Sequence, residues 1–168
     1  ALWPFACSFE PLREAAVHSW EWDGSDTSPV PTGWWSMGFT GNGLLGAMVT
    51  AGNETADDMG TLRIEIGRTD ILDDRMPGTE YAVGNGGRCD RVRLPIGYFQ
   101  LRTAGKVTRG SMRLSLAHAT LKGNLTTSAG TISFSIFTHA LRDLNVAHLT
   151  TSAGESAAEW LWNPRPGS

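Results

Sequence analysis

The chain has 168 residues, of which 40% are apolar and 18% are charged, and its formal net charge is -3. These values exclude a disordered chain and a membrane-embedded one, and a chain of this length is typical of a single domain. No apolar run approaches the roughly 20 residues of a transmembrane helix, and the scattered Lys and Arg residues form no basic stripe that would indicate nucleic-acid binding.

The chain begins with an irregular stretch. Residues 1–19, which contain prolines, are predicted to form an extended N-terminal arm over the domain. The alternation over 17–22 favours a short strand, although the apolar spacing over 11–22 also allows a helix. Residues 23–33 are rich in Gly, Pro and Ser and therefore predict a loop.

A turn signal followed by an apolar run dominates the next segment. Gly41-Asn42-Gly43 is typical of a turn, because Gly adopts positive φ without steric cost and Asn tolerates the left-handed region. Residues 44–49 are uncharged and mostly apolar. They predict a strand buried on both faces, with a buried helix as the alternative.

Short alternating stretches follow as far as residue 148. Residues 61–66 predict a half-buried antiparallel strand, whereas 67–88 predict a long loop that is functional or mobile. Pro95 cannot donate to a sheet ladder, so the strand over 92–98 is expected at a sheet edge or with a bulge. Further strands are expected around 112–121, 132–136 and 144–148, with 123–130 as a turn region.

About seven or eight short strands with frequent turns are typical of a sandwich. Together with the abundance of glycine, they predict an all-β chain, an antiparallel β-sandwich with long loops. The sandwich domain is predicted over 20–156. Residues 157–168, which end in a Pro- and Gly-rich stretch, are predicted to be a C-terminal linker or tail.

Several features bear on the compartment of the protein. Cys7 and Cys89 either form one disulfide, as an oxidising compartment would allow, or remain two buried thiols. Asn53 and Asn124 each begin an Asn-x-Thr sequon in a turn-like stretch, which predicts N-glycosylation. The chain starts at Ala1 rather than Met, so either a leader is removed or the sequence is a piece of a longer protein. Together these features indicate a secreted, extracellular glycoprotein of a eukaryote.

The order of the motifs carries a family resemblance. Ser36-Met37 followed by residues 41–49, Gly-Asn-Gly-Leu-Leu-Gly-Ala-Met-Val, resembles the signature that opens the N-terminal β-sandwich of glycoside hydrolase family 95, the α-L-fucosidase family. Residues 60–70 resemble an uncharacterised N-terminal domain of family-95-like hydrolases. Later strands of that domain are similar to 91–94, 112–120 and 130–134, so that the resemblance covers residues 20–155.

The resemblance implies a sandwich of the supersandwich type that supports a catalytic (α/α) barrel and extends a loop to the rim of its active site. In the family the barrel follows the sandwich and needs several hundred residues, which this sequence does not contain. The resemblance therefore implies an accessory domain with no catalytic residue in this chain, and we expect neither a cofactor nor a metal. Its partners would be the C-terminal barrel, other subunits or glycans.

This sequence departs from the family pattern at three places. Gly38 stands where the family usually has proline, Phe39-Thr40 adds a residue before the Gly-Asn-Gly turn, and Arg68 replaces the usual lysine. The departures around the turn imply that its loop is aimed differently here.

Acidic residues cluster on both sides of the 61–66 strand, and glycoside hydrolysis needs two carboxyls about 5 to 10 Å apart across a cleft. Clusters of this kind are usually solvated loops, and no EF-hand spacing indicates calcium. The histidines are too widely spaced for a metal site. The residues weighed here are Glu54, Asp57, Asp58, Asp70, Asp73, Asp74, His18, His118, His139 and His148.

The tryptophans suggest two kinds of contact. Trp34 and Trp35 beside Asn42 predict a carbohydrate contact, because indoles stack on sugar rings and an amide binds hydroxyls, with core packing as the alternative. Tryptophans near the chain ends either pack into the core or form an exposed apolar patch that docks another domain or subunit. These are Trp20, Trp22, Trp160 and Trp162.

The leading hypothesis is therefore a non-catalytic sandwich domain of a secreted carbohydrate-active protein. An extracellular structural or assembly subunit that reuses the sandwich is one alternative. A free carbohydrate-binding module is the other.

Overall fold

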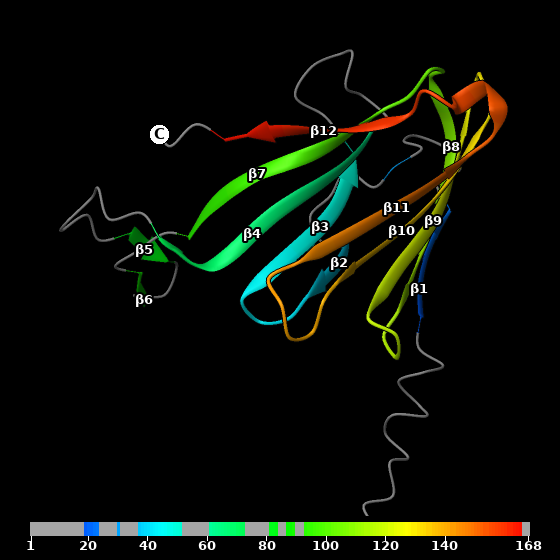
Figure 1. Cartoon of the computed structure of the whole chain (residues 1–168). Helices are drawn as coiled ribbons and strands as arrows, with labels where there is room; N and C mark the ends of the chain where they lie inside the picture. The colour runs from blue at the N-terminus through cyan, green and yellow to red at the C-terminus, as the bar shows by residue number, and fades with distance from the viewer. Residues whose placement is uncertain are drawn as a thin grey trace, which may run out of the picture.

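The computed structural model describes residues 19–23, 30, 37–51, 61–72, 81–83, 87–89 and 93–165. Their side chains are described at 30, 37–51, 61–72 and 95–165. Two five-stranded antiparallel sheets pack against each other, which confirms the predicted all-β sandwich. Figure 1 shows the two sheets side by side, joined by connections at their ends.

Each sheet takes strands from distant parts of the chain. Sheet A has the order β1-β8-β9-β10-β11, and sheet B has the order β12-β7-β4-β3-β2. In sheet A the strands are β1 (Ser19–Asp23), β8 (Val107–Ser115), β9 (Thr120–Thr127), β10 (Thr131–Thr138) and β11 (Asn145–Thr151). In sheet B they are β2 (Gly38–Gly41), β3 (Leu45–Ala51), β4 (Leu62–Leu72), β7 (Arg93–Arg102) and β12 (Glu159–Pro164).

The core lies between the sheets and follows from the alternation of each strand. In β10, Ile132, Phe134 and Ile136 point inward and are at most 3% exposed, whereas the residues between them are exposed or half-buried. Because successive side chains of a strand point to opposite faces, the other face of the same strand is free to carry polar groups. The core is completed mainly by Val49, Leu62, Ile64, Leu101, Leu121 and Leu125.

The Gly-Asn-Gly turn is confirmed. It joins β2 to β3 in a hairpin in which Gly41 pairs with Gly46, and Gly43 has φ of 93°. The following run is a strand, as predicted, but not one buried on both faces. Its outward Met48 is 47% exposed, because sheet B has no third layer over this position among the described residues.

The structure also confirms the bulge predicted at Pro95. Strand β7 lies between β12 and β4, but its pairing with β12 ends at Gly97, so among the described residues Pro95 is paired with β4 alone. Gly97 pairs with Ile66 and Pro95 pairs with Gly67, which leaves Ile96 as an extra residue. The bulge removes the need for a hydrogen bond that proline cannot donate.

Two stretches predicted to be irregular, 123–130 and 67–88, contain strands. Residues 123–130 were expected to be a turn region, but β9 continues to Thr127 and only 128–130 turn. Gly123 belongs to the strand because it makes room for a core ring: a Cβ there would lie 2.2 Å from Cζ of Phe134. Within 67–88, β4 continues to Leu72, and β5 (Tyr81–Val83) pairs with β6 (Gly87–Cys89).

The predicted linker or tail over 157–168 contains a strand over half of its length. Residues Glu159–Pro164 form β12, which pairs with β7 at the edge of sheet B. The ring of Trp162 lies tilted against that of Phe99 with centroids 4.7 Å apart, and Trp160 packs against the core. The polar and proline-rich composition of this stretch does not predict a strand. The strand is stabilised by the contacts of these two indoles with Phe99 and the core.

Candidate functional site

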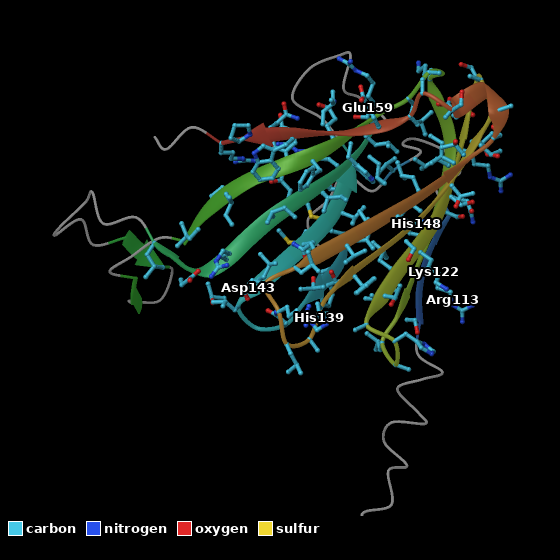
Figure 2. All side chains as sticks on the ribbon, in the orientation of Figure 1. Arg113, Lys122, His139, Asp143, His148 and Glu159 are labelled. Atoms are coloured by element: carbon cyan, nitrogen blue, oxygen red, sulfur yellow. The ribbon has the colours of Figure 1, made fainter. Side chains whose placement is uncertain are left out.

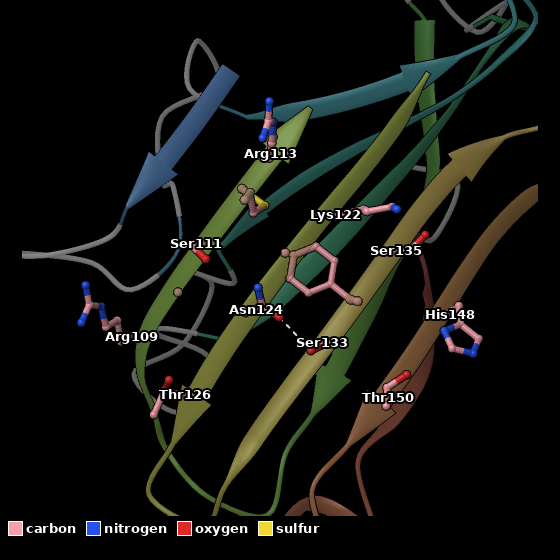
Figure 3. Close-up of a pocket in the computed structure, with 14 residues that line it drawn as sticks. Arg109, Ser111, Arg113, Lys122, Asn124, Thr126, Ser133, Ser135, His148 and Thr150 are labelled. Atoms are coloured by element: carbon pink, nitrogen blue, oxygen red, sulfur yellow. Dashed lines mark hydrogen bonds between the residues drawn. The ribbon is translucent and has the colours of Figure 1, made fainter. Parts of the chain in front are cut away.

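The outer face of sheet A is hollowed and polar. A cavity of about 960 Å³ extends over β8, β9, β10 and β11 (Figure 3). Its polar side chains are the outward members of the alternation that buries the core, whereas Met112 and Phe134, which also line it, belong to the core. We call this cavity the outer hollow; its polar side chains are Arg109, Ser111, Arg113, Lys122, Asn124, Thr126, Ser133, Ser135, His148 and Thr150.

Strand register arranges these side chains in rows that run across the sheet. The cationic row consists of Arg113, Lys122, Ser135 and His148, and the polar row beside it consists of Ser111, Asn124, Ser133 and Thr150. In the polar row the Ser133 hydroxyl donates to Oδ1 of Asn124 over 2.7 Å, the dashed line in Figure 3. Figure 2 shows Arg113, Lys122 and His148 on the same outer side of the sandwich.

Asn42, predicted to contact sugar, has a structural role in the β2–β3 turn. Its Oδ1 accepts hydrogen bonds from the backbone N–H groups of Leu44 and Leu45, at 3.0 and 2.8 Å. Its Nδ2 donates to the carbonyls of His139 and Arg142, at 3.0 and 3.2 Å. These four bonds use both amide protons and both acceptor positions of the side chain. The sugar contact stays a prediction.

Other predicted site residues lie outside the described part of the chain. The predicted site residues outside the described part are Trp34, Trp35, Asn53 and Cys7. For Cys89 only the backbone is described. The indole contact with sugar, the glycan at Asn53 and the Cys7–Cys89 pairing therefore stay predictions.

The second sequon occupies an unexpected position. Asn124 is exposed, but it lies in the middle of β9 and inside the outer hollow, not in a turn. A glycan attached there would cover the polar row. Its glycosylation stays a prediction.

Near the Asn42 turn, one arginine binds two carboxylates. Arg68 donates to Asp70 over 2.9 Å and to Asp143 over 3.0 Å. Its hydrogen bond holds the pKa of Asp70 below the ordinary value, against the opposite effect of desolvation. Asp70 and Asp143 are therefore both bound by one cation. Asp73 and Asp74 lie outside the described residues.

Glu155 lies at the opposite end of the sandwich and is fully buried. It ends the short helix η2 (Ala153–Glu155), within the 152–158 connection that carries the chain from sheet A back to sheet B. Its carboxylate accepts hydrogen bonds from the N–H groups of Ala104 (2.8 Å) and Gly105 (2.9 Å) and from the hydroxyl of Thr127. Burial alone would raise the pKa of Glu155, but these three donors hold it below the ordinary value.

The remaining polar candidates are dispersed. Nδ1 of His118 lies 2.9 Å from the Ser115 hydroxyl, and His139 Nδ1 accepts from the N–H of Leu141. Among the described residues, no three His, Cys, Asp or Glu side chains gather in a group that could hold a metal ion. None of the helices described is long and apolar enough to cross a membrane.

Comparisons of this chain with models of protein families, with curated proteins and with solved structures found no match.

The sequence reasoning missed the outer hollow. Alternating outward polar residues over 109–113 and 122–126 were a signal for it, but the register that places Arg113 opposite Lys122 could not be obtained from alternation alone.

Proposed function

We propose that this chain is a non-catalytic β-sandwich domain of a secreted carbohydrate-active protein, resembling family-95-like hydrolases and supporting a catalytic barrel that lies outside this sequence. The observation that supports a domain without catalysis is that its carboxylates are bound in ion pairs and hydrogen bonds. Every described acidic side chain is bound within the sandwich. Glu65 pairs with Arg63 and Arg165, Asp70 and Asp143 with Arg68, Glu159 with Arg102, and Glu155 with backbone donors.

An apolar pair on sheet B supports the role of a supporting domain. Phe39 and Met48 lie opposite each other in β2 and β3 and are 60% and 47% exposed. They adjoin a groove of about 310 Å³ that Met37 and Met48 line. Adjacent exposed apolar side chains next to a groove suit contact with another domain.

The outer hollow favours a carbohydrate-binding module as the second candidate. Its hydroxyl and amide groups are suited to sugar hydroxyls, because each can donate or accept a hydrogen bond. This second candidate requires no barrel.

The full-length transcript tests the proposal. We expect the reading frame to continue past Ser168 into several hundred residues with helical periodicity, and the full-length product to hydrolyse 4-nitrophenyl α-L-fucoside. The 168-residue chain alone should release no nitrophenol. A reading frame that ends without such a region, or hydrolysis by the isolated chain, would contradict the proposal.

A further inference from the structure

We infer that the outer hollow of sheet A binds an acidic polysaccharide whose carboxylates are spaced along its chain, such as a polymer of uronic acids. The inference rests on the proposed function in one respect, namely that the ligand is a saccharide. It assigns the ligand class and the face that binds it.

The charge of the cationic row is the first argument. Arg113 and Lys122 lie directly opposite each other on neighbouring strands, with side chains on the same face. Like charges directly opposite each other destabilise a sheet, so the pairing with Arg113 does not account for the charge of Lys122. His148 adds a third basic side chain, two strands from Lys122 in the same row. The described residues that line the hollow include no Asp or Glu, although the whole chain carries a net charge of -3.

Arg113 lies on the strand next to the β1 edge of sheet A, whereas Lys122 lies on the central strand β9. Glu21 is the register partner of Arg113 at the β1 edge of sheet A. The interior of the row, from Lys122 to His148, has Ser135 between the two basic residues. The argument therefore depends most on Lys122, the exposed basic residue in the middle of the sheet.

The polar row supplies the second half of the recognition. Ser111, Asn124, Ser133 and Thr150 present hydroxyl and amide groups on four neighbouring strands. Since neighbouring strands are about 4.8 Å apart, the row spans about 14 Å. An extended saccharide lying along it would place its hydroxyls on the polar row and its carboxylates on the adjacent cationic row.

The same residues argue against a nucleic acid or a densely sulfated glycan. Single-stranded nucleic acid is bound by exposed aromatic side chains that stack on bases. The described lining offers only the buried ring of Phe134, which is 3% exposed. Neutral hydrogen-bonding groups outnumber the cations, which fits a polymer with one carboxylate per unit better than one with several sulfates.

Glycosylation of Asn124 and occupation of the hollow exclude each other, because a glycan on this residue would fill the polar row. The protein should therefore be tested in two forms. One comes from a bacterial host without N-glycosylation and the other from a eukaryotic secretory host. The inference requires the mass of the second form to show an unmodified Asn124, against the prediction from its sequon, and a glycan at that residue would overturn the inference.

The chain contains a matched pair of lysines for the test. Lys122 lies in the hollow, whereas Lys106 is exposed in the 103–106 connection at the end of the sandwich, and they are the only lysines of the chain. Lys122→Glu and Lys106→Glu change the net charge equally. A carboxylate at position 122 would face Arg113, so we expect Lys122→Glu to fold, which thermal unfolding verifies.

Affinity electrophoresis in gels containing polygalacturonate measures the binding. We expect the unchanged chain to be retarded, Lys122→Glu to bind at least about fivefold more weakly, and Lys106→Glu to stay within about twofold. Raising the salt concentration should weaken the retardation. Hydroxyethyl cellulose, which is neutral, should cause none. Equal losses in both variants, no retardation, or tighter binding to single-stranded DNA would each overturn the inference.

This test is independent of the transcript. If polygalacturonate binds through Lys122 but the gene has no barrel, the inference stands and the supporting role fails. If the gene encodes the barrel but the hollow binds nothing, the supporting role stands and the inference fails.

Discussion

The two ends of the sandwich are closed by different chemistry. At one end, at the upper right of Figure 1, Glu155 joins the 103–106 connection to its own connection and, through Thr127, to the 128–130 turn. At the other end Asn42 joins the β2–β3 turn to the 139–144 loop. Each end thus depends on one side chain that satisfies backbone groups of a segment distant in sequence.

The difference lies in charge and in access to water. Glu155 is fully buried, and its two backbone donors would lose a charged partner if it were removed. Asn42 is only half-buried, so water can replace part of what it provides. A buried carboxylate is tolerated because several donors surround it, and it therefore contributes more than the amide.

Glu155→Ala should cause the largest loss. It leaves the N–H groups of Ala104 and Gly105 without their carboxylate acceptor, and hydrogen bonds to charged groups are each worth about 1.5 to 3 kcal/mol. We expect the free energy of unfolding to fall by about 3 kcal/mol in urea titrations. Glu159→Ala is the matched control, because that carboxylate is exposed and lies 3.6 Å from Arg102. Equal losses in the two variants would contradict the role of Glu155.

Asn42→Ala should cause a smaller loss, of about 1 to 2 kcal/mol in the same titration, since its four bonds are to neutral groups near the surface. Asn163→Ala removes an amide with one long bond, 3.3 Å to the Leu161 carbonyl, and should change little. If Asn42→Ala destabilised the protein more than Glu155→Ala, the two ends would rank in the opposite order.

Acid should distinguish the two ends by a smaller effect. Because the pKa of Glu155 is lowered in the folded state, its charged form adds stability that is present above the pKa of an unfolded glutamate, about 4.3. That stability is lost as pH falls through this value toward the folded pKa. Urea titrations from pH 7 to pH 3.5 should show a shallower decline for Glu155→Gln than for the unchanged chain. Asn42→Ala should keep the unchanged slope.

Local sequence chemistry was enough to predict several elements of the fold. Alternation predicted the strands around residues 64 and 134, and the missing N–H of Pro95 predicted its bulge. Local sequence chemistry failed to predict strands whose formation depends on a tertiary contact. Gly123 is in a strand because the Phe134 ring lies against it, and β12 is a strand because Trp162 reaches Phe99.

The candidate sites were predictable to a smaller extent. Asn42 was recognised as a turn residue, but its bonds to His139 and Arg142 join residues about a hundred positions apart and have no local signal. Lys122 had no feature of its own in the sequence. Lys122 became a candidate binding residue only through the strand register, which places it opposite Arg113.

Glu155 also constrains the order in which the molecule can be completed. Its donors precede it by 51, 50 and 28 residues, so the 103–106 connection emerges from the ribosome long before its acceptor exists. Because chains are synthesised from the N-terminus and non-local contacts form slowly, a nascent chain that stops short of this glutamate lacks the acceptor that joins the 103–106 connection to the 152–158 connection.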